Sequence, residues 1–148
     1  EYVLKKYDIP PRSIEIELTE SLFYNDMKSL SVLVSRIHHA GLSCSIDDFG
    51  SGYSSLNMLK DVKVDALKLD RVFFESGDND ERGKDIIQSV IKLAQALDLH
   101  TISEGVEERK QVEFLKEMHC DLIQGYVFAK PMPVPEFEQL AFGTEAAD

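Results

Sequence analysis

The sequence predicts an α/β protein with about five parallel strands and flanking helices. Short runs of β-branched or aliphatic residues alternate with longer amphipathic stretches, which is typical of βαβ units. The 148 residues are 43% hydrophobic, which suits one ordinary core. A polar or charged residue also stands at or just after the end of each short apolar run. These observations predict one architectural unit with its chemistry along one edge of a sheet.

The short apolar runs predict strands over residues 13–18, 43–46, 64–69, 100–103 and 121–124. The clearest helix covers 81–97, because apolar residues recur there at helical spacing: Ile86, Val90, Leu93, Ala94 and Leu97. Gly41 is a stop signal for a helix over 28–40. Further helices are expected over 107–118 and after Pro135, and only a short one fits between the second and third strands.

The charge balance excludes one class of partner and favours another. Lys and Arg total 16 against 27 Asp and Glu, a net charge of -11, so no basic surface is available for polymeric DNA or RNA. An acidic protein can still act on a small phosphate ester when divalent cations lie between its carboxylates and the substrate. The composition therefore points towards a metal site.

The cysteines and the chain ends indicate the cellular compartment in which we expect the protein. Cys44 and Cys120 lie far apart without metal-ligand spacing, so neither a disulfide nor a zinc site is expected, and a cytoplasmic protein fits. No stretch approaches the ~20 apolar residues of a membrane span. The chain begins with Glu1 rather than Met, so we expect a piece of a longer protein whose upstream segments could carry a membrane anchor. Residues 143–148 are expected to be a disordered tail.

The histidines share no metal-ligand spacing. We interpret them as surface or helix-end residues rather than catalytic ones: His38, His39, His100 and His119.

The residues that end the predicted strands carry the functional signal. They are polar or charged in every case: Glu17, Asp47 with Asp48, Lys68, Glu104 and Gln124. The C-terminal ends of parallel strands converge on one crevice, where α/β enzymes hold their active sites. Each residue taken alone is better explained as a helix cap or a solvated turn. Together they favour a site, because capping does not select a lysine among acidic and amide side chains.

Asp47 and Asp48 indicate the kind of site. Neighbouring residues of a strand point to opposite faces, so both can reach one pocket only if the strand ends between them, and residues 49–52 permit such a turn. Adjacent carboxylates repel each other unless a cation lies between them, as in two-metal sites for phosphoryl transfer. Mg²⁺ or Mn²⁺ suits ligands that are all oxygen.

The alternation of the first strand places Glu15 and Glu17 on the same face of the sheet. Glu15 would then point into the interior of the fold, where an unpaired carboxylate is costly. We therefore hypothesise a basic partner for Glu15 in the portion of the protein that precedes this chain.

Five ordered blocks resemble the EAL phosphodiesterase family: IELTES at 16–21, DDFGSGYSSL at 47–56, KLDRVF at 68–73, EGVE at 104–107 and QGYVFAKP at 124–131. The resemblance implies a TIM-like (β/α) barrel, of which residues 1–142 form the C-terminal portion. It also implies metal-dependent hydrolysis of cyclic di-GMP to linear pGpG. A complete barrel typically needs ~250 residues, so about five of its eight strands are expected here.

The resemblance assigns roles to the strand-end residues. Glu17, Asp47, Asp48 and Glu104 resemble ligands of two Mg²⁺ or Mn²⁺ ions, and Lys68 and Glu104 resemble the catalytic residues that orient or activate water. Other residues resemble substrate-binding or supporting positions: Glu20, Asp70, Glu107, Gln124 and Pro131. A loop anchored by Glu20 resembles one that couples metal occupancy to dimerisation, and it comprises Phe49, Gly50, Ser51, Gly52 and Tyr53.

The resemblance also implies that three site residues lie upstream: the glutamate of the Glu-Ala-Leu motif, an arginine that binds substrate and an asparagine that binds metal. We therefore expect the isolated chain to be inactive and its unpaired edge strands to favour a homodimer or a swapped association. Two alternatives stay open at this point. One is a catalytically inactive receptor for cyclic di-GMP, and the other is a structural half-barrel used for dimerisation.

Overall fold

The computed structural model describes residues 2–19, 22, 27–50, 56–74 and 81–143. Its centre is a sheet of five strands that follow one another in chain order, each parallel to the next. The strands are β1 (Glu15–Thr19), β2 (Ser43–Phe49), β3 (Ala66–Leu69), β4 (His100–Ser103) and β5 (Leu122–Ile123). The predicted α/β class, the parallel pairing and the number of strands are confirmed.

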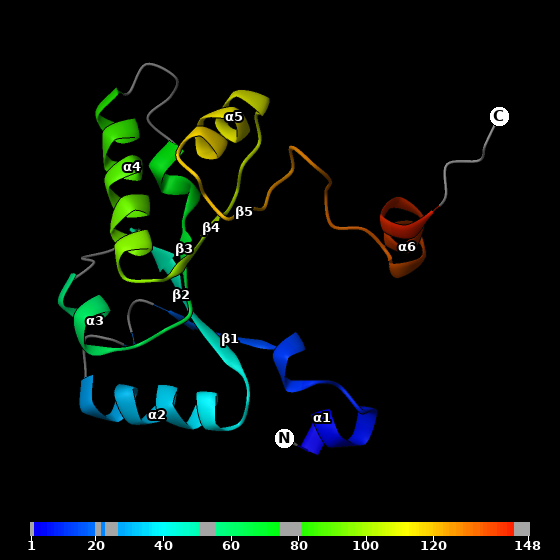
Figure 1. The fold of residues 1–148 in the computed structure, drawn as a ribbon. Coiled ribbons are helices and arrows are strands. Elements are labelled where there is room, and N and C mark those ends of the chain that lie inside the picture. The colour runs from blue at the N-terminus through cyan, green and yellow to red at the C-terminus, as the bar shows by residue number, and fades with distance from the viewer. Residues whose placement is uncertain (1, 20–21, 23–26, 51–55, 75–80, 144–148) are drawn as a thin grey trace.

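Helices α2 to α6 occupy the predicted stretches with small differences at their ends, and α1 precedes them. They are α1 (Tyr2–Tyr7), α2 (Met27–His39), α3 (Leu56–Asp61), α4 (Glu81–Ala96), α5 (Arg109–Glu117) and α6 (Val134–Phe142). Two 3-10 helices, η1 (Pro11–Ser13) and η3 (Arg71–Phe74), complete the order. Helices α2 to α5 cover one side of the curved sheet, whereas α6 lies apart from it (Figure 1). No described helix combines the length and hydropathy needed to cross a bilayer.

The main core lies between the sheet and α2 to α5. Alternate residues of the central strands point into it and are at most 1% exposed: Cys44, Ile46, Leu67 and Leu69. Burial of one such apolar side chain stabilises the fold by ~1.5–3 kcal/mol relative to exposure. The residues between them, which include Lys68, must therefore point to the other face of the sheet.

The apolar stripe of α4 differs from the predicted one. The helix buries Ile87, Ile91 and Ala94, whereas Ile86 is 46% exposed and Leu97 is 41% exposed. Two apolar stripes at helical spacing overlap on this helix, and sequence spacing alone does not decide between them. Packing against the sheet selects the stripe that contains Ile87 and Ile91.

The predicted end of the second strand is wrong. β2 does not stop between Asp47 and Asp48 but continues to Phe49. Ile46 pairs with Leu67 and Phe49 with Leu69, so β2 has one residue more than β3 over this interval, which is a β-bulge. Asp48 is the extra residue, with φ 55, a left-handed conformation that Asp tolerates better than most residues. The bulge returns the Phe49 side chain to the core, where it is 3% exposed.

Two aspartates secure the opposite, N-terminal ends of the strands. Asp65 precedes β3, and its Oδ2 accepts the backbone N–H of Cys44 at 2.8 Å. Asp121 precedes β5, and its Oδ2 accepts the N–H and the hydroxyl of Thr101, each at 2.8 Å. Partial burial alone would raise the pKa of Asp121, but the hydrogen bonds from Thr101 outweigh burial and hold the pKa below its ordinary value of 3.8.

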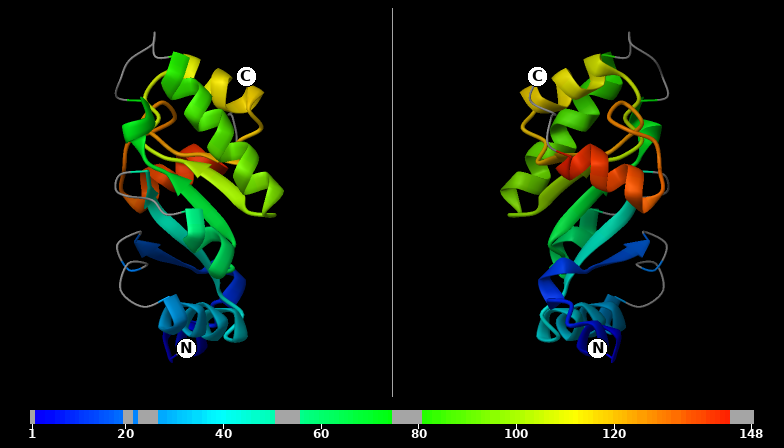
Figure 2. Two further views of the ribbon diagram at one scale, coloured as in Figure 1. Left: turned by 90° about the vertical axis from the view of Figure 1, so that its left-hand side faces the viewer. Right: turned by 90° about the vertical axis from the view of Figure 1, so that its right-hand side faces the viewer.

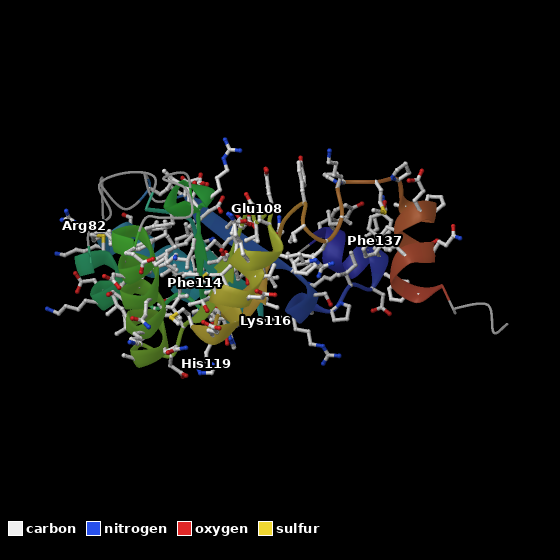
Figure 3. The ribbon with its side chains drawn as sticks, turned by 90° about the horizontal axis from the view of Figure 1, so that it is seen from above. Arg82, Glu108, Phe114, Lys116, His119 and Phe137 are labelled. Atoms are coloured by element: carbon white, nitrogen blue, oxygen red, sulfur yellow. The ribbon has the colours of Figure 1, made fainter. Side chains whose placement is uncertain are left out.

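Helix α6 and the sheet edges present uncovered surfaces. α6 buries none of its residues, and Phe137, which Figure 3 labels on this separate helix, is 50% exposed. Phe137 contacts Phe142 edge to face at a centroid distance of 6.1 Å, and both residues belong to α6. β1 and β5 each pair with a single neighbour within the described sheet.

Replacement of Asp121 by Asn tests the capping interaction. A carboxyl whose pKa is lower in the folded state stabilises the fold above its unfolded pKa, and this contribution is lost as pH falls through the folded pKa. We expect Asp121→Asn to lower the free energy of unfolding by about 1 kcal/mol at pH 7, since the side chain is 43% exposed and partly screened. Urea unfolding should show that the stability difference between the unmodified chain and Asp121→Asn shrinks as pH falls below 3.8, the ordinary pKa of an aspartate. Asp98→Asn, at an exposed left-handed residue, is the matched control.

Candidate functional site

The ammonium group of Lys68 is the centre of the candidate site. Its Nζ lies 2.6 Å from Oε1 of Glu17, 2.9 Å from Oδ1 of Asp47 and 3.0 Å from Oε1 of Glu104. These carboxylates come from β1, from β2 and from the residue that follows β4. Figure 2 shows the arrowheads of the strands pointing to the same side of the molecule, which is the edge where the cluster forms. The predicted convergence of these strand-end residues is present in the fold.

Strand register explains why these side chains meet. Lys68 lies between Leu67 and Leu69, both buried in the helix-facing core, so it emerges on the opposite face of β3. β3 is the middle strand, flanked by β2 and β4, which deliver Asp47 and Glu104 from either side. Lys68 itself is 6% exposed, so the charge is held at the sheet and not in solvent.

The electrostatics keep Lys68 charged. Burial alone would lower the pKa of Lys68, but its contacts with Glu17, Asp47 and Glu104 outweigh burial and raise the pKa above the ordinary value of 10.5. A permanently protonated lysine cannot act as a general base. It can donate hydrogen bonds and stabilise negative charge on a neighbouring group.

The acidic residues exceed the positive charge available to them. Partial burial and the neighbouring carboxylates of Asp47 and Asp70 raise the pKa of Asp48, and Lys68 offsets this only in part. Oδ1 of Asp47 is buried and forms an ion pair with Nζ of Lys68 at 2.9 Å, so three carboxylates share one positive charge. The cluster can therefore accept further positive charge.

Two neighbouring residues shape the backbone of the site. Asp70 accepts the N–H of Val72 at 2.7 Å and so begins η3 directly after β3. Gly50 has φ 98, and a Cβ at this position would collide with the ring of Phe73. The bulged end of β2 thus needs glycine for both conformation and space.

The other predicted site residues do not join the cluster. Glu107, Gln124 and Pro131 are exposed, and their side chains make no hydrogen bond or ion pair within the described residues. The backbone of Gln124 does make hydrogen bonds beside the site. Its N–H donates to the carbonyl of Ser103 at 2.8 Å, and its carbonyl accepts the N–H of Val106 at 3.1 Å. Their substrate-binding roles stay predictions. Glu20, Ser51, Gly52 and Tyr53 lie outside the described residues, as do 144–148 of the predicted tail.

The fold also forms a cluster that the sequence did not reveal. His38, Cys44 and Asp65 come together at the N-terminal ends of β2 and β3, with His38 Nε2 2.9 Å from Asp65 Oδ2. Local spacing gave no signal, since the three residues come from different elements. The position of two of them at strand starts is the one pattern that could have suggested it.

Comparison with known proteins identifies relatives over nearly the whole chain. A model of the EAL domain matches residues 1–131. The cyclic di-GMP phosphodiesterase NbdA of Pseudomonas aeruginosa is 42% identical over 126 residues, which is 85% of this chain and 16% of the relative. The cyclic di-GMP phosphodiesterase RocR of the same species is 39% identical over 143 residues, 96% of this chain and 36% of the relative.

Solved structures agree in fold. The PaMucR phosphodiesterase in complex with c-di-GMP superposes with a TM-score of 0.85 at 34% identity, over 92% of this chain and 55% of that chain. The EAL domain of Mycobacterium smegmatis DcpA gives a TM-score of 0.86 at 34% identity, over 94% of this chain and 62% of that chain. The chain thus spans less than two thirds of the length of each of these relatives.

Replacement of Lys68 by Met tests the electrostatic account of the cluster. The carboxylates of Glu17, Asp47 and Glu104 would be left together without their cation, while Met keeps much of the apolar length. We expect the free energy of unfolding at pH 7 to fall by about 2 kcal/mol, less than for a fully buried pair because the Glu17 side chain is 52% exposed. Urea unfolding measures this change. Lys84→Met, at an exposed ion pair with Glu81, should change stability by less than ~0.5 kcal/mol.

Proposed function

The chain belongs to the EAL domain family, and from this premise we propose that its complete domain hydrolyses cyclic di-GMP to linear pGpG with the help of divalent cations. The observation that carries the proposal is the convergence of Glu17, Asp47 and Glu104 on Lys68 at the C-terminal ends of parallel strands. The names of NbdA and RocR support the choice of substrate and reaction.

The acidic residues fit Mg²⁺ or Mn²⁺. Their donors are all carboxylate oxygens, which these hard cations prefer. Glu17, Asp47 and Glu104 surround the single positive charge of Lys68, and burial together with the carboxylates of Asp47 and Asp70 raises the pKa of Asp48. We assign Glu17, Asp47, Asp48 and Glu104 as the residues of this chain that would hold the ions. Such ions would supply Lewis-acid neutralisation of the phosphate and a more acidic water.

Lys68 and Glu104 are the proposed catalytic residues of this chain. Lys68 is protonated, so it donates a hydrogen bond to a phosphate oxygen or to the attacking water and stabilises negative charge as it develops. The Glu104 side chain is 22% exposed, so one of its oxygens can reach water at the rim of the sheet while Oε1 holds Lys68. Glu104 then positions that water and accepts its proton.

The remaining predicted residues support this centre in the proposal. Asp70 holds the start of η3 beside the cluster. Glu20, Glu107, Gln124 and Pro131 bind substrate or orient the ligands. The loop of Phe49, Gly50, Ser51, Gly52 and Tyr53 links metal occupancy to dimerisation.

The same residues would serve a receptor that binds cyclic di-GMP without cleaving it. The sequence contains no Glu-Ala-Leu stretch, and this chain covers 55% and 62% of the two solved EAL chains, so the proposal requires residues outside these 148 to complete the site. The exposed α6 and the single-neighbour strands β1 and β5 offer surfaces for that completion or for a second copy. Hydrolysis is favoured because every position of the resembled site that falls within this chain keeps its acidic or basic residue.

An activity assay on the full-length protein tests the proposal. With Mg²⁺ or Mn²⁺ we expect conversion of cyclic di-GMP to pGpG, which chromatography measures. Chelation of the metal should abolish this activity. Lys68→Met and Asp47→Asn should each lower kcat at least ~100-fold, because both act where charge develops. Lys84→Met and Asp85→Asn make the same chemical changes on α4, away from the cluster, and should leave kcat within ~2-fold.

The 148-residue chain alone is the comparison for the same assay. We expect it to show little or no turnover and to self-associate through its uncovered strands, measured by sedimentation. Comparable turnover by the chain alone would contradict the expected need for upstream residues. Tight binding of cyclic di-GMP by the full-length protein with no turnover under any divalent cation would replace the enzyme with the receptor.

A further inference from the structure

A second group of possible metal ligands lies at the N-terminal end of the sheet. It combines the last turn of α2, the start of β2 and the residue before β3, which contribute His38, Cys44 and Asp65. One ligand atom from each lies within 4.8 Å of the others. His38 Nε2 is 2.9 Å from Asp65 Oδ2 and 3.8 Å from Cys44 Sγ.

We propose that His38, Cys44 and Asp65 bind a thiophilic divalent cation of the Zn²⁺ class. Thiolate sulfur, imidazole nitrogen and carboxylate oxygen are the donors that Zn²⁺ takes in proteins, often as three protein ligands with water in a fourth position. A hard cation such as Mg²⁺ avoids sulfur, so this donor set separates the two classes of metal.

The proposed zinc-class site is distinct from the carboxylate cluster around Lys68. Cys44 and Asp47 are three positions apart in β2, so strand geometry separates them by ~10 Å. Cys44 belongs to the face that packs on the helices, whereas Asp47 contacts Lys68 on the other face. One ion cannot be shared by the two groups.

The aspartate at the other strand start shows what ordinary capping looks like. Asp121 accepts the backbone N–H of Thr101 just as Asp65 accepts that of Cys44, so backbone capping alone explains this bond. At Asp121, Nδ1 of His100 lies 4.0 Å from Oδ1, and the thiol of Cys120 contacts backbone carbonyls. Capping does not explain why both a thiol and an imidazole converge on Asp65.

Access and protonation are compatible with ion binding. The side chains of His38 and Asp65 are 37% and 41% exposed, so an ion can approach from solvent, while Cys44 is fully buried behind them. Burial and the Asp65 carboxylate raise the pKa of Cys44 to about 11, so an incoming ion must displace the thiol proton. Zn²⁺ and Co²⁺ can do so because they bind thiolate strongly.

Titration of the full chain with Co²⁺ tests the site. Mg²⁺ is held in excess so that hard-cation sites are filled, and the thiolate-to-cobalt charge-transfer absorption reports binding to sulfur. We expect one Co²⁺ per chain, displaced by Zn²⁺. Cys44→Ser should abolish the charge-transfer absorption, and His38→Gln, at a partly exposed residue, should raise the Kd for Co²⁺ at least ~10-fold. Cys120→Ser and His100→Gln are the matched controls from the Asp121 end and should bind as the unmodified chain does.

Two outcomes overturn the proposal. One is the absence of a charge-transfer absorption in the unmodified chain at millimolar Co²⁺. The other is a Kd that is unchanged in His38→Gln or raised equally in the controls. Circular dichroism of each variant identifies any that fails to fold. If Cys44→Ser does not fold, His38→Gln alone decides the result, since the His38 side chain is not part of the buried core.

Discussion

Burial of one positive charge organises the functional edge of this domain. The side chain of Lys68 is 7% exposed, a position that an ammonium group can occupy only with close partners. Glu17, Asp47 and Glu104 provide them, and these carboxylates could not approach one another without the lysine. Because the four side chains come from different strands, the cluster exists only when β1 to β4 are paired in register.

The two ends of the parallel sheet serve different physical purposes. At the C-terminal ends, carboxylates are crowded, and burial together with the carboxylates of Asp47 and Asp70 raises the pKa of Asp48. At the N-terminal ends, Asp65 and Asp121 satisfy backbone N–H groups of neighbouring strands and hold the register. The length of the strands separates the capped end of the sheet from the end that carries the charged cluster. Changes at one end can therefore be studied with limited effect on the other.

The sequence predicted the parallel sheet and a common edge for the strand-end residues, because alternation and strand ends are local signals whose meeting point follows from parallel pairing. The central place of Lys68 among Glu17, Asp47 and Glu104 came from the structure. The sequence did not predict the bulge at Asp48, which depends on register with β3 and on the approach of Gly50 to Phe73. It also missed the contact between Asp65 and Cys44, since residues 21 positions apart carry no spacing signal. The roles of exposed residues such as Gln124 depend on a substrate and so stay predictions.

Acidic side chains from separate strands should form one cation-attracting edge around Lys68. Paramagnetic broadening of backbone amide resonances by Mn²⁺ measures this on the folded chain. We expect low Mn²⁺ concentrations to broaden the signals of Asp47, Lys68 and Glu104 first, while His100 and Thr101 at the opposite end of the sheet stay sharp. Equal broadening at both ends, or broadening that spares the residues around Lys68, would contradict it.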